Sequence, residues 1–375
     1  LMNFNAFKEL ARESGRTLPD CFTQGIEKLS NYVAYAMDPL CDDPLNNDSD
    51  LEPVNGEILE YAQQFNRPDW VYIATNGAQG NAPEGPPSIM FPWAGQLVMR
   101  SGWDSQAQWG FFDVGPLGIG HWHQDRLHLS VTAYGRDLLV DGGRFTYQGG
   151  PWRSYFTGSA SHNVLLVDGK GQQSTVKETK QAMSGNFAIT PEYDFCWGVY
   201  DEKFEGIEDA VTHERAMLYV RGTYWLVLDR VSASAPHVIT ALWHFHPACT
   251  VAVEEGSAVS TDPDQGNIRV VPDTGPFWEI ALIKGQEDPA PQGWWSPDYN
   301  LKEPNTCAAF SVPIEKQQVF AWLLAPAKGI PSKATVTISA QDETFYTVQV
   351  VQEGKAACAW KISFNDNNPV TVAGN

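Results

Sequence analysis

The stretch GIGHWHQDRLHLSVTAYGRDLLVDGGRFTYQGG, residues 118–150, combines strand-forming sequence with closely spaced polar side chains. Its runs LSVTAYG and DLLVDGG are largely apolar and end in glycine turns, which is typical of antiparallel strands. Just before them, His121, His123 and Asp125 occupy alternate positions. Alternate side chains of a strand share a face, so the pattern predicts that these polar groups lie together beside an apolar core. His128 has the other parity, which predicts that it faces away and is structural.

Outside this stretch, the sequence predicts a mainly β protein with a short helical leader. Residues 1–68 space apolar side chains at intervals of three and four in NAFKELARES, FTQGIEKLSNYVAYAM and GEILEYAQQF, which predicts three helices. Three short helices bury little surface alone, so they are expected to end a larger helical domain. Residues 69–300 alternate short apolar runs with turn formers, which is typical of an antiparallel β-sandwich. The break PAPQGWWSPDYNLKEPN predicts a separate small β-sheet domain over 301–375.

Composition excludes several classes of protein. The formal net charge of −20 disfavours nucleic acid as a partner, because phosphate binding needs a basic surface. No apolar run approaches the ~18 residues of a membrane span, and no signal peptide is visible at the amino end. Since the chain opens on Leu, we expect a mature form or a fragment of a secreted or periplasmic protein. The six cysteines lack a C-x-x-C pair, and Cys21 with Cys41 is the most local disulfide they allow.

His123, Asp141 and His162 are candidate metal ligands. Imidazole and carboxylate groups from neighbouring strands suit zinc and similar ions and leave room for water. The alternative is three separately hydrogen-bonded polar residues at turns.

His121, Tyr147 and Arg153 are candidate catalytic residues. A histidine can donate or accept a proton near neutral pH, a tyrosine can do so when its pKa is lowered, and an arginine can counter a negative substrate. The alternative for Tyr147 is an aromatic residue packed near a strand end, which is the commoner situation for tyrosines in general. Other candidates have structural alternatives of equal or greater weight: His213, His244 and His246 as core histidines, and Trp294, Trp295 and Tyr299 as sugar-stacking or seam-filling rings.

The residues GPLGIGHWHQDRLHLSVTAYGRDLLVDGGRFTYQGGPWRSYFTGSASHNVLLVDGKGQ resemble the heparinase II/III-like family of polysaccharide lyases. The shared elements are Gly-His-x-His-x-Asp, Leu-Leu-Val-Asp, a Tyr, an Arg, and His-Asn before Val-Asp-Gly. The segments 46–50, 212–231 and 293–304 are also similar, so the resemblance covers most of the chain. Gln124 departs from the small residue that the family often has there.

The resemblance implies an α/α toroid joined to β-sandwich domains, with residues 1–68 matching only the last toroid helices. An upstream toroid is therefore an expected partner, and an oligomer is compatible with the sequence. The resemblance also implies a divalent metal at His123, Asp141 and His162, with zinc as first choice and Ca²⁺ or Mn²⁺ as alternatives. It places His121 and Tyr147 in the cleft and implies that His121 neutralises charge.

The activity implied is β-elimination at a uronic acid of an anionic polysaccharide such as alginate, ulvan or a glycosaminoglycan. With only 25 Lys and Arg in the chain, a heavily sulfated polymer is disfavoured. A glycoside hydrolase would need paired carboxylates, and Asp104, Asp113 and Asp125 form no convincing pair. A carbohydrate-binding module that is inactive without its toroid is the other alternative.

Overall fold

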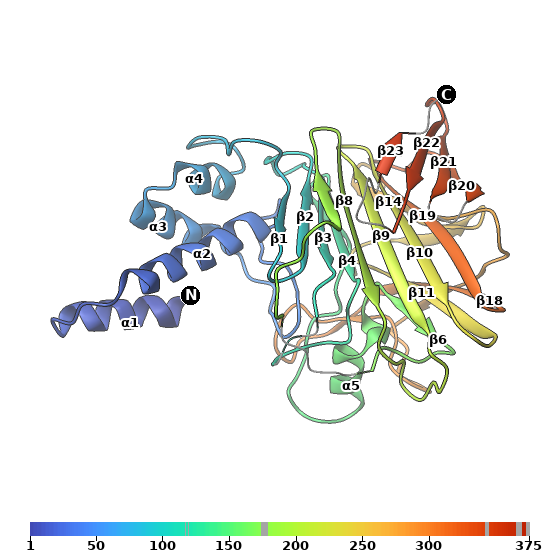
Figure 1. Ribbon diagram of the computed structural model, residues 1–375, viewed down its shortest axis with the longest axis horizontal. Coiled ribbons are helices and arrows are strands. Elements are labelled where there is room, and N and C mark those ends of the chain that lie inside the picture. Colours follow the sequence, from blue (N-terminus) through green and yellow to red (C-terminus); the bar gives the residue numbers. More distant parts are fainter. Residues whose placement is uncertain (117, 119, 174–178, 342–344, 365–369, 373–375) are drawn as a thin grey trace.

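The computed structural model describes residues 1–116, 118, 120–173, 179–341, 345–364 and 370–372 (Figure 1). Its helices are α1 Met2–Glu13, α2 Asp20–Ala36, α3 Asn55–Phe65, α4 Pro68–Ala74 and α5 Pro151–Thr157. The first three confirm the predicted leader. The other two are single short segments that each begin at a proline, where the missing N–H is not needed. No helix within these ranges has the length and apolar character needed to cross a membrane.

Two antiparallel sheets form the body of the molecule (Figure 1). The first has the order β1-β2-β3-β4-β5-β11-β18-β15, with β6 paired to β11. Its strands are β1 Ile89–Phe91, β2 Gln96–Arg100, β3 Trp109–Asp113, β4 Leu129–Ala133, β5 Arg136–Leu139, β6 Leu165–Val167, β11 His237–Phe245, β15 Glu279–Lys284 and β18 Thr306–Ile314.

The second sheet has the order β12-β13-β14-β19-β10-β9-β8-β7. Its strands are β7 Phe187–Ile189, β8 Tyr193–Tyr200, β9 Thr212–Val220, β10 Tyr224–Ser232, β12 Val251–Glu254, β13 Ser257–Ser260, β14 Gly266–Pro272 and β19 Gln317–Lys328. A two-stranded ribbon, β16 Trp294–Trp295 and β17 Glu303–Pro304, lies outside both sheets.

The main core lies between the two large sheets and is rich in aromatic rings. Trp243 of the first sheet and Trp322 of the second are fully buried, with ring centroids 5.8 Å apart. Phe310 packs edge-on against the same Trp322 at 5.2 Å. Removing such large apolar surfaces from water is the main driving force that holds two sheets together. The predicted antiparallel β-sandwich is therefore confirmed.

The predicted start of the small C-terminal sheet at residue 301 is wrong. Strand β18 lies between β11 and β15, and strand β19 lies between β10 and β14, so both are inner strands of the large sheets. The separate sheet contains only β20 Ala334–Gln341, β21 Tyr346–Gln352, β22 Cys358–Ile362 and β23 Val370–Val372. It covers the outer face of the second sheet, where Trp360 Nε1 donates to Tyr224 Oη at 2.9 Å. The Pro-rich loop therefore connects strands of the same sandwich. Its composition gave the wrong boundary because strand pairing depends on residues far away in the chain.

The helical leader extends from the side of the first sheet (Figure 1). Helices α2, α3 and α4 share a small core that includes Ile58 and Trp70. Tyr32 of α2 contacts Phe91 of β1, and its hydroxyl donates to Gln96 at 2.7 Å. The disulfide allowed by the sequence is absent, because Cys21 and Cys41 are both free.

A buried ion pair joins the second sheet to the loops of the first. Asp229 accepts hydrogen bonds from Arg215, from His213 Nε2 at 2.7 Å and from Trp322 Nε1 at 2.9 Å. The second terminal nitrogen of Arg215 donates to the carbonyls of Leu127 at 2.8 Å and residue 163 at 2.6 Å. Although burial opposes it, Arg215 and His213 lower the pKa of Asp229 well below its usual range. The structural interpretation of His213 is confirmed.

We expect Asp229→Ala to lower the free energy of unfolding by about 3–5 kcal/mol, because it leaves a buried guanidinium without its counter-charge. Urea unfolding followed by circular dichroism measures the loss. Glu279→Ala, at an exposed position of β15, is the control and should change stability by no more than about 0.5 kcal/mol. A loss below about 1 kcal/mol for Asp229→Ala would contradict the role given to this ion pair.

Candidate active site

The segment from His121 to Asp125 is a loop between β3 and β4, so the strand predicted there is wrong. His121 has a positive φ of 57°, a backbone conformation that no regular strand contains. The alternation argument therefore fails, and His121 separates from His123 and Asp125. The His121 side chain is 71% exposed, whereas His123 and Asp125 are buried. The loop thus presents one imidazole to solvent and encloses the other.

Asp48, which sequence reasoning did not select, joins the predicted residues. One of its carboxylate oxygens lies 2.9 Å from His121 Nδ1, and the other lies 3.0 Å from His123 Nε2. Arg153 donates to both oxygens, at 2.6 and 3.0 Å. Although burial opposes it, these hydrogen bonds hold the pKa of Asp48 well below its usual range. Asp48 is therefore an anion that fixes two histidines and an arginine.

The segment from Asn47 to Leu51 ties Asp48 to the sandwich, and we call it the strap. Asn47 Oδ1 accepts from the backbone N–H of His123 at 3.0 Å. Asp50 pairs with Arg144 through two hydrogen bonds. The N–H of Leu51 donates to the carbonyl of residue 297 at 2.7 Å. The only available signal for the strap was the similarity of the segment 46–50 to the family, which gave no role to any one residue.

Tyr147 lies on the exposed side of His121. Its hydroxyl is 3.3 Å from His121 Nδ1, its side chain is 51% exposed, and the Arg153 guanidinium lies over its ring. The structure thus brings the three predicted catalytic residues together. It does not support the alternative of a packed aromatic residue for Tyr147. Tyr299 is also exposed, and its ring centroid lies 5.9 Å from that of Tyr147.

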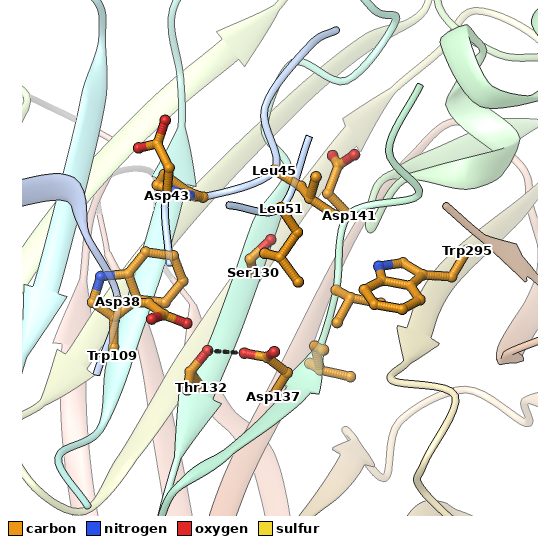
Figure 2. Close-up of a pocket in the computed structure, with 13 residues that line it drawn as sticks. Asp38, Asp43, Leu45, Leu51, Trp109, Ser130, Thr132, Asp137, Asp141 and Trp295 are labelled. Atoms are coloured by element: carbon orange, nitrogen blue, oxygen red, sulfur yellow. Dashed lines mark hydrogen bonds between the residues drawn. The ribbon is translucent and has the colours of Figure 1, made fainter. Parts of the chain in front are cut away.

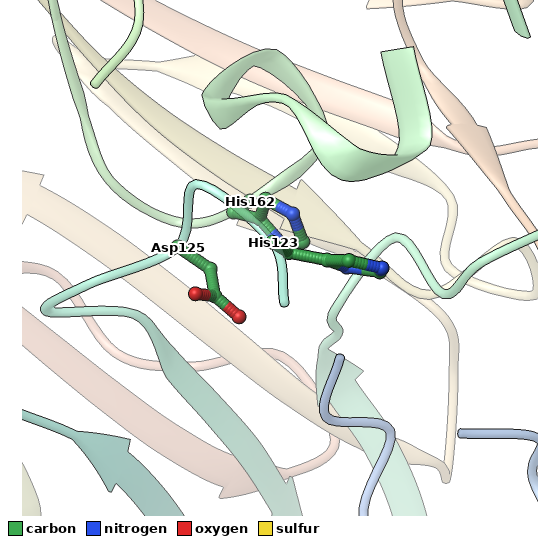
Figure 3. Close-up of side chains that lie close together, drawn as sticks. All are labelled: His123, Asp125 and His162. Carbon is green, nitrogen blue, oxygen red and sulfur yellow. The ribbon is translucent and has the colours of Figure 1, made fainter. Parts of the chain in front are cut away.

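The three predicted metal ligands are close together but fall into two overlapping groups. Figure 3 shows His123 and His162 against each other, with ring centroids 5.3 Å apart and Asp125 beside them. Donor atoms of these three residues lie within 4.8 Å of one another. Asp141 instead groups with His128 and His162, and its Oδ2 lies 2.8 Å from His162 Nδ1. His162 is common to both groups.

The unused ring nitrogens fit a metal ion. Among the residues that the structure describes, His123 Nδ1 and His162 Nε2 have no hydrogen-bond partner although they are buried, which is costly unless another group binds them. The other nitrogen of each ring lies beside a carboxylate, Asp48 for His123 and Asp141 for His162. Histidine ligands of metals are usually oriented by such a carboxylate. Burial raises the pKa of Asp125, the carboxylate grouped with these two histidines, to about 8, and a bound cation would reverse this shift.

The prediction that His128 faces away from the site is wrong. The loop conformation brings its Nε2 to 3.5 Å from Asp141 and its ring to 5.7 Å from that of His162. Its Nδ1 accepts from the N–H of Asn163 at 2.9 Å, and its Nε2 lies 2.8 Å from Ser130 Oγ. Burial lowers the pKa of His128 to about 3. With both nitrogens occupied, His128 is a supporting residue of the cluster.

A small cavity of about 30 Å³ lies below the strap (Figure 2). Asp38, Asp137 and Asp141 line it together with Trp295, and Thr132 Oγ1 donates to Asp137 at 2.6 Å. Trp295 is 5% exposed, and its neighbour in β16 is 9% exposed. Because both tryptophan rings are buried, they are packed inside the protein as the seam-filling alternative predicts, and they are not available to stack on a sugar. His244 and His246 do not form a metal group among the described residues, and His244 Nδ1 lies 3.2 Å from Asn163 Oδ1.

The fold and site define a class of protein in which a helical segment and a β-sandwich together supply one polar site. Within that class, the chain belongs to the heparinase II/III-like family, because residues 83–361 match the model of its C-terminal region, Heparinase II/III-like, C-terminal. The family expected from the sequence is thereby confirmed.

Individual relatives are distant. A heparin-sulfate lyase from Pedobacter heparinus is 23% identical over 236 residues, which are 61% of this chain and 34% of the relative. The crystal structure of heparan sulfate lyase HepC from the same organism superposes with a TM-score of 0.81 at 19% identity and covers 96% of this chain and 56% of its own. A heparinase III gene product gives 0.77 at 20% identity, with 92% and 54% covered. The chain thus spans only about a third to a half of these relatives.

We expect Asp48→Ala to lower the free energy of unfolding by about 2–4 kcal/mol, because His123 and Arg153 lose a buried charged partner. Differential scanning calorimetry and urea unfolding measure the change. Glu60→Ala, at an exposed position of α3 in the same helical leader, is the matched control. If both variants unfold like the unmodified chain, the strap does not stabilise the site.

Proposed function

We propose that this chain is part of a polysaccharide lyase that cleaves a uronic-acid-containing glycosaminoglycan by β-elimination. The observation that carries the proposal is the exposed His121 imidazole, held by Asp48 and flanked by Tyr147 and Arg153. The similarity to heparin-sulfate and heparan sulfate lyases favours a glycosaminoglycan over alginate or ulvan. We further propose a secreted or periplasmic location, where such polymers are met.

The chemistry requires charge neutralisation, a base and an acid. The C5 proton of a uronate is weakly acidic while the adjacent carboxylate is charged, and a preorganised donor stabilises the enolate-like transition state. His121 is the donor that faces solvent. Arg153 binds Asp48 with both terminal nitrogens, so it holds the carboxylate that orients His121 and has less of its charge available for substrate.

Proton transfer follows neutralisation of the carboxylate. A base removes the C5 proton, and an acid protonates the leaving O4. Tyr147 is placed to assist because its hydroxyl is exposed and borders His121. We propose that further acid or base groups come from a helical toroid, which this chain would meet through its leader.

We also propose a divalent ion at the sequence-predicted positions His123, Asp141 and His162, with zinc as the first choice. The unpartnered nitrogens of His123 and His162 support two imidazole ligands. Asp141 lies beside His162, and Asp125 is the competing carboxylate. Such an ion would fix the loops that carry these residues, and it would keep the two imidazoles neutral.

His121→Ala should lower turnover by on the order of 10²-fold or more and leave folding and metal content unchanged. The assay follows the absorbance of the unsaturated product from a uronate polymer, using the full-length gene product. Reducing ends without this absorbance would indicate a hydrolase, and binding without any product would indicate a carbohydrate-binding module. Near-normal turnover of the variant, or loss of its metal, contradicts the role given to His121. His237→Ala, on the far end of β11, controls for the loss of an imidazole.

Metal analysis of protein purified without chelators should find about one divalent ion per chain. His162→Ala should abolish it and lower the melting temperature, whereas His121→Ala should retain it. Asp125→Asn and Asp141→Asn then identify the third ligand, because losing a ligand removes the ion and losing an orienting partner weakens binding by about 10–100-fold. A metal content near zero, with no thermal shift on adding zinc, would refute the site.

A further inference from the structure

An exposed aromatic surface continues from His121 away from the buried histidines. The rings of His121 and Tyr147 lie 6.0 Å apart, and those of Tyr147 and Tyr299 lie 5.9 Å apart. Tyr299 is 44% exposed, in contrast to the buried tryptophans a few residues before it. The flat faces of exposed aromatic rings are suited to stacking on sugar rings. The row His121, Tyr147 and Tyr299 therefore has the form of a path for a sugar chain.

Arg144 contacts both tyrosines of this row. Its guanidinium carbon lies 5.1 Å from the ring centroid of Tyr147 and 4.8 Å from that of Tyr299. Asp50 binds the same guanidinium with both carboxylate oxygens, and the Arg144 side chain is only 12% exposed. The charge of Arg144 is compensated and its donors are directed at Asp50. Arg144 therefore positions the two tyrosines, and an anionic ligand would need a different cation.

Lys302 is that cation. Its Nζ lies 3.8 Å from the ring centroids of both Trp152 and Trp294 and 5.9 Å from that of Phe145. Within the described part of the chain, no carboxylate lies at salt-bridge distance from Lys302. Aromatic faces attract an ammonium and restrict its position without neutralising its charge. An uncompensated cation held in this way is notable in a chain with a net charge of −20.

The loop that carries Tyr299 and Lys302 is fixed to the Tyr147 loop. The N–H of Asn300 donates to the carbonyl of Phe145 at 2.6 Å, and Phe145 itself contacts Trp152. The loops that present the tyrosine pair and the ammonium are therefore joined to each other. In an acidic protein, a polyanion can bind only where such local cations offset the repulsion.

We propose that Tyr299 and Lys302 form a binding subsite for a sugar next to the cleaved residue, with Tyr299 stacking on its ring and Lys302 pairing with its sulfate or carboxylate. This assignment deepens the proposed lyase function and uses the same site. It makes Lys302 a specificity-determining residue, because an ammonium discriminates charged from neutral sugars at that position.

The test compares Lys302→Gln with Lys361→Gln, an exposed lysine of β22 in the small sheet, in the full-length gene product. Steady-state kinetics on a sulfated and an unsulfated uronate-containing oligosaccharide should show that Lys302→Gln raises KM about tenfold, with the loss on KM rather than kcat. A rise for the sulfated substrate alone identifies sulfate as the partner, and an equal rise for both identifies the carboxylate. An unchanged KM on both substrates overturns the subsite.

A second pair of variants tests the stacking. Tyr299→Ala should raise KM about fivefold, and Tyr299→Phe should restore it, because the ring face is retained. Phe277→Ala, which removes a 90% exposed ring elsewhere, should have no effect. Two measurements on the same oligosaccharides separate this proposal from the lyase function. Absence of unsaturated product in the absorbance assay refutes the lyase. Equal affinities of the unmodified protein and Lys302→Gln in titration calorimetry refute the subsite.

Discussion

The ion pair between Arg215 and Asp229 is the constraint on which the site depends. Two charges removed from water are tolerable only when every donor and acceptor is satisfied, and here the second sheet supplies the carboxylate while the first supplies backbone carbonyls. Those carbonyls belong to residues that adjoin His128 and His162. The sandwich core therefore fixes the backbone of the histidine loops from below, before any metal or substrate is considered. The order of the site comes from a feature that lies outside it.

The strap adds a second set of contacts to the histidine loops. Asp48 comes from the helical leader, whereas His121 and His123 come from the loop between β3 and β4 and Arg153 comes from α5. A single low-pKa carboxylate thus links an exposed imidazole, a buried imidazole and a guanidinium. The same anion therefore fixes the position of the exposed imidazole that we propose as the donor to substrate. The buried imidazole keeps one nitrogen free for an ion.

Much of the fold followed from local pattern, and the failures have physical causes. The hairpin of β9 and β10 follows from two apolar runs joined at a turn, and the leader helices follow from the spacing of apolar residues at three and four. The inner positions of β18 and β19 depend on partners up to a hundred residues away, so composition at the Pro-rich loop gave the wrong boundary. His121, Tyr147 and Arg153 were identified through their motif and do converge. Asp48 was missed because it lies 73 residues before His121, and no local spacing pattern in the sequence indicates so distant a contact.

The position of the strap has a consequence for how this protein can change over evolutionary time. Domains are commonly exchanged by recombination at the linkers between them, which is harmless when a linker only connects. Here the strap, a loop of the helical leader between α2 and α3, carries Asp48 and Asp50, which bind residues of the sandwich. A crossover between helices and strands would separate partners that must be inherited together. The helical and β parts are therefore expected to diverge as one lineage, with the strap among the slowest-changing segments.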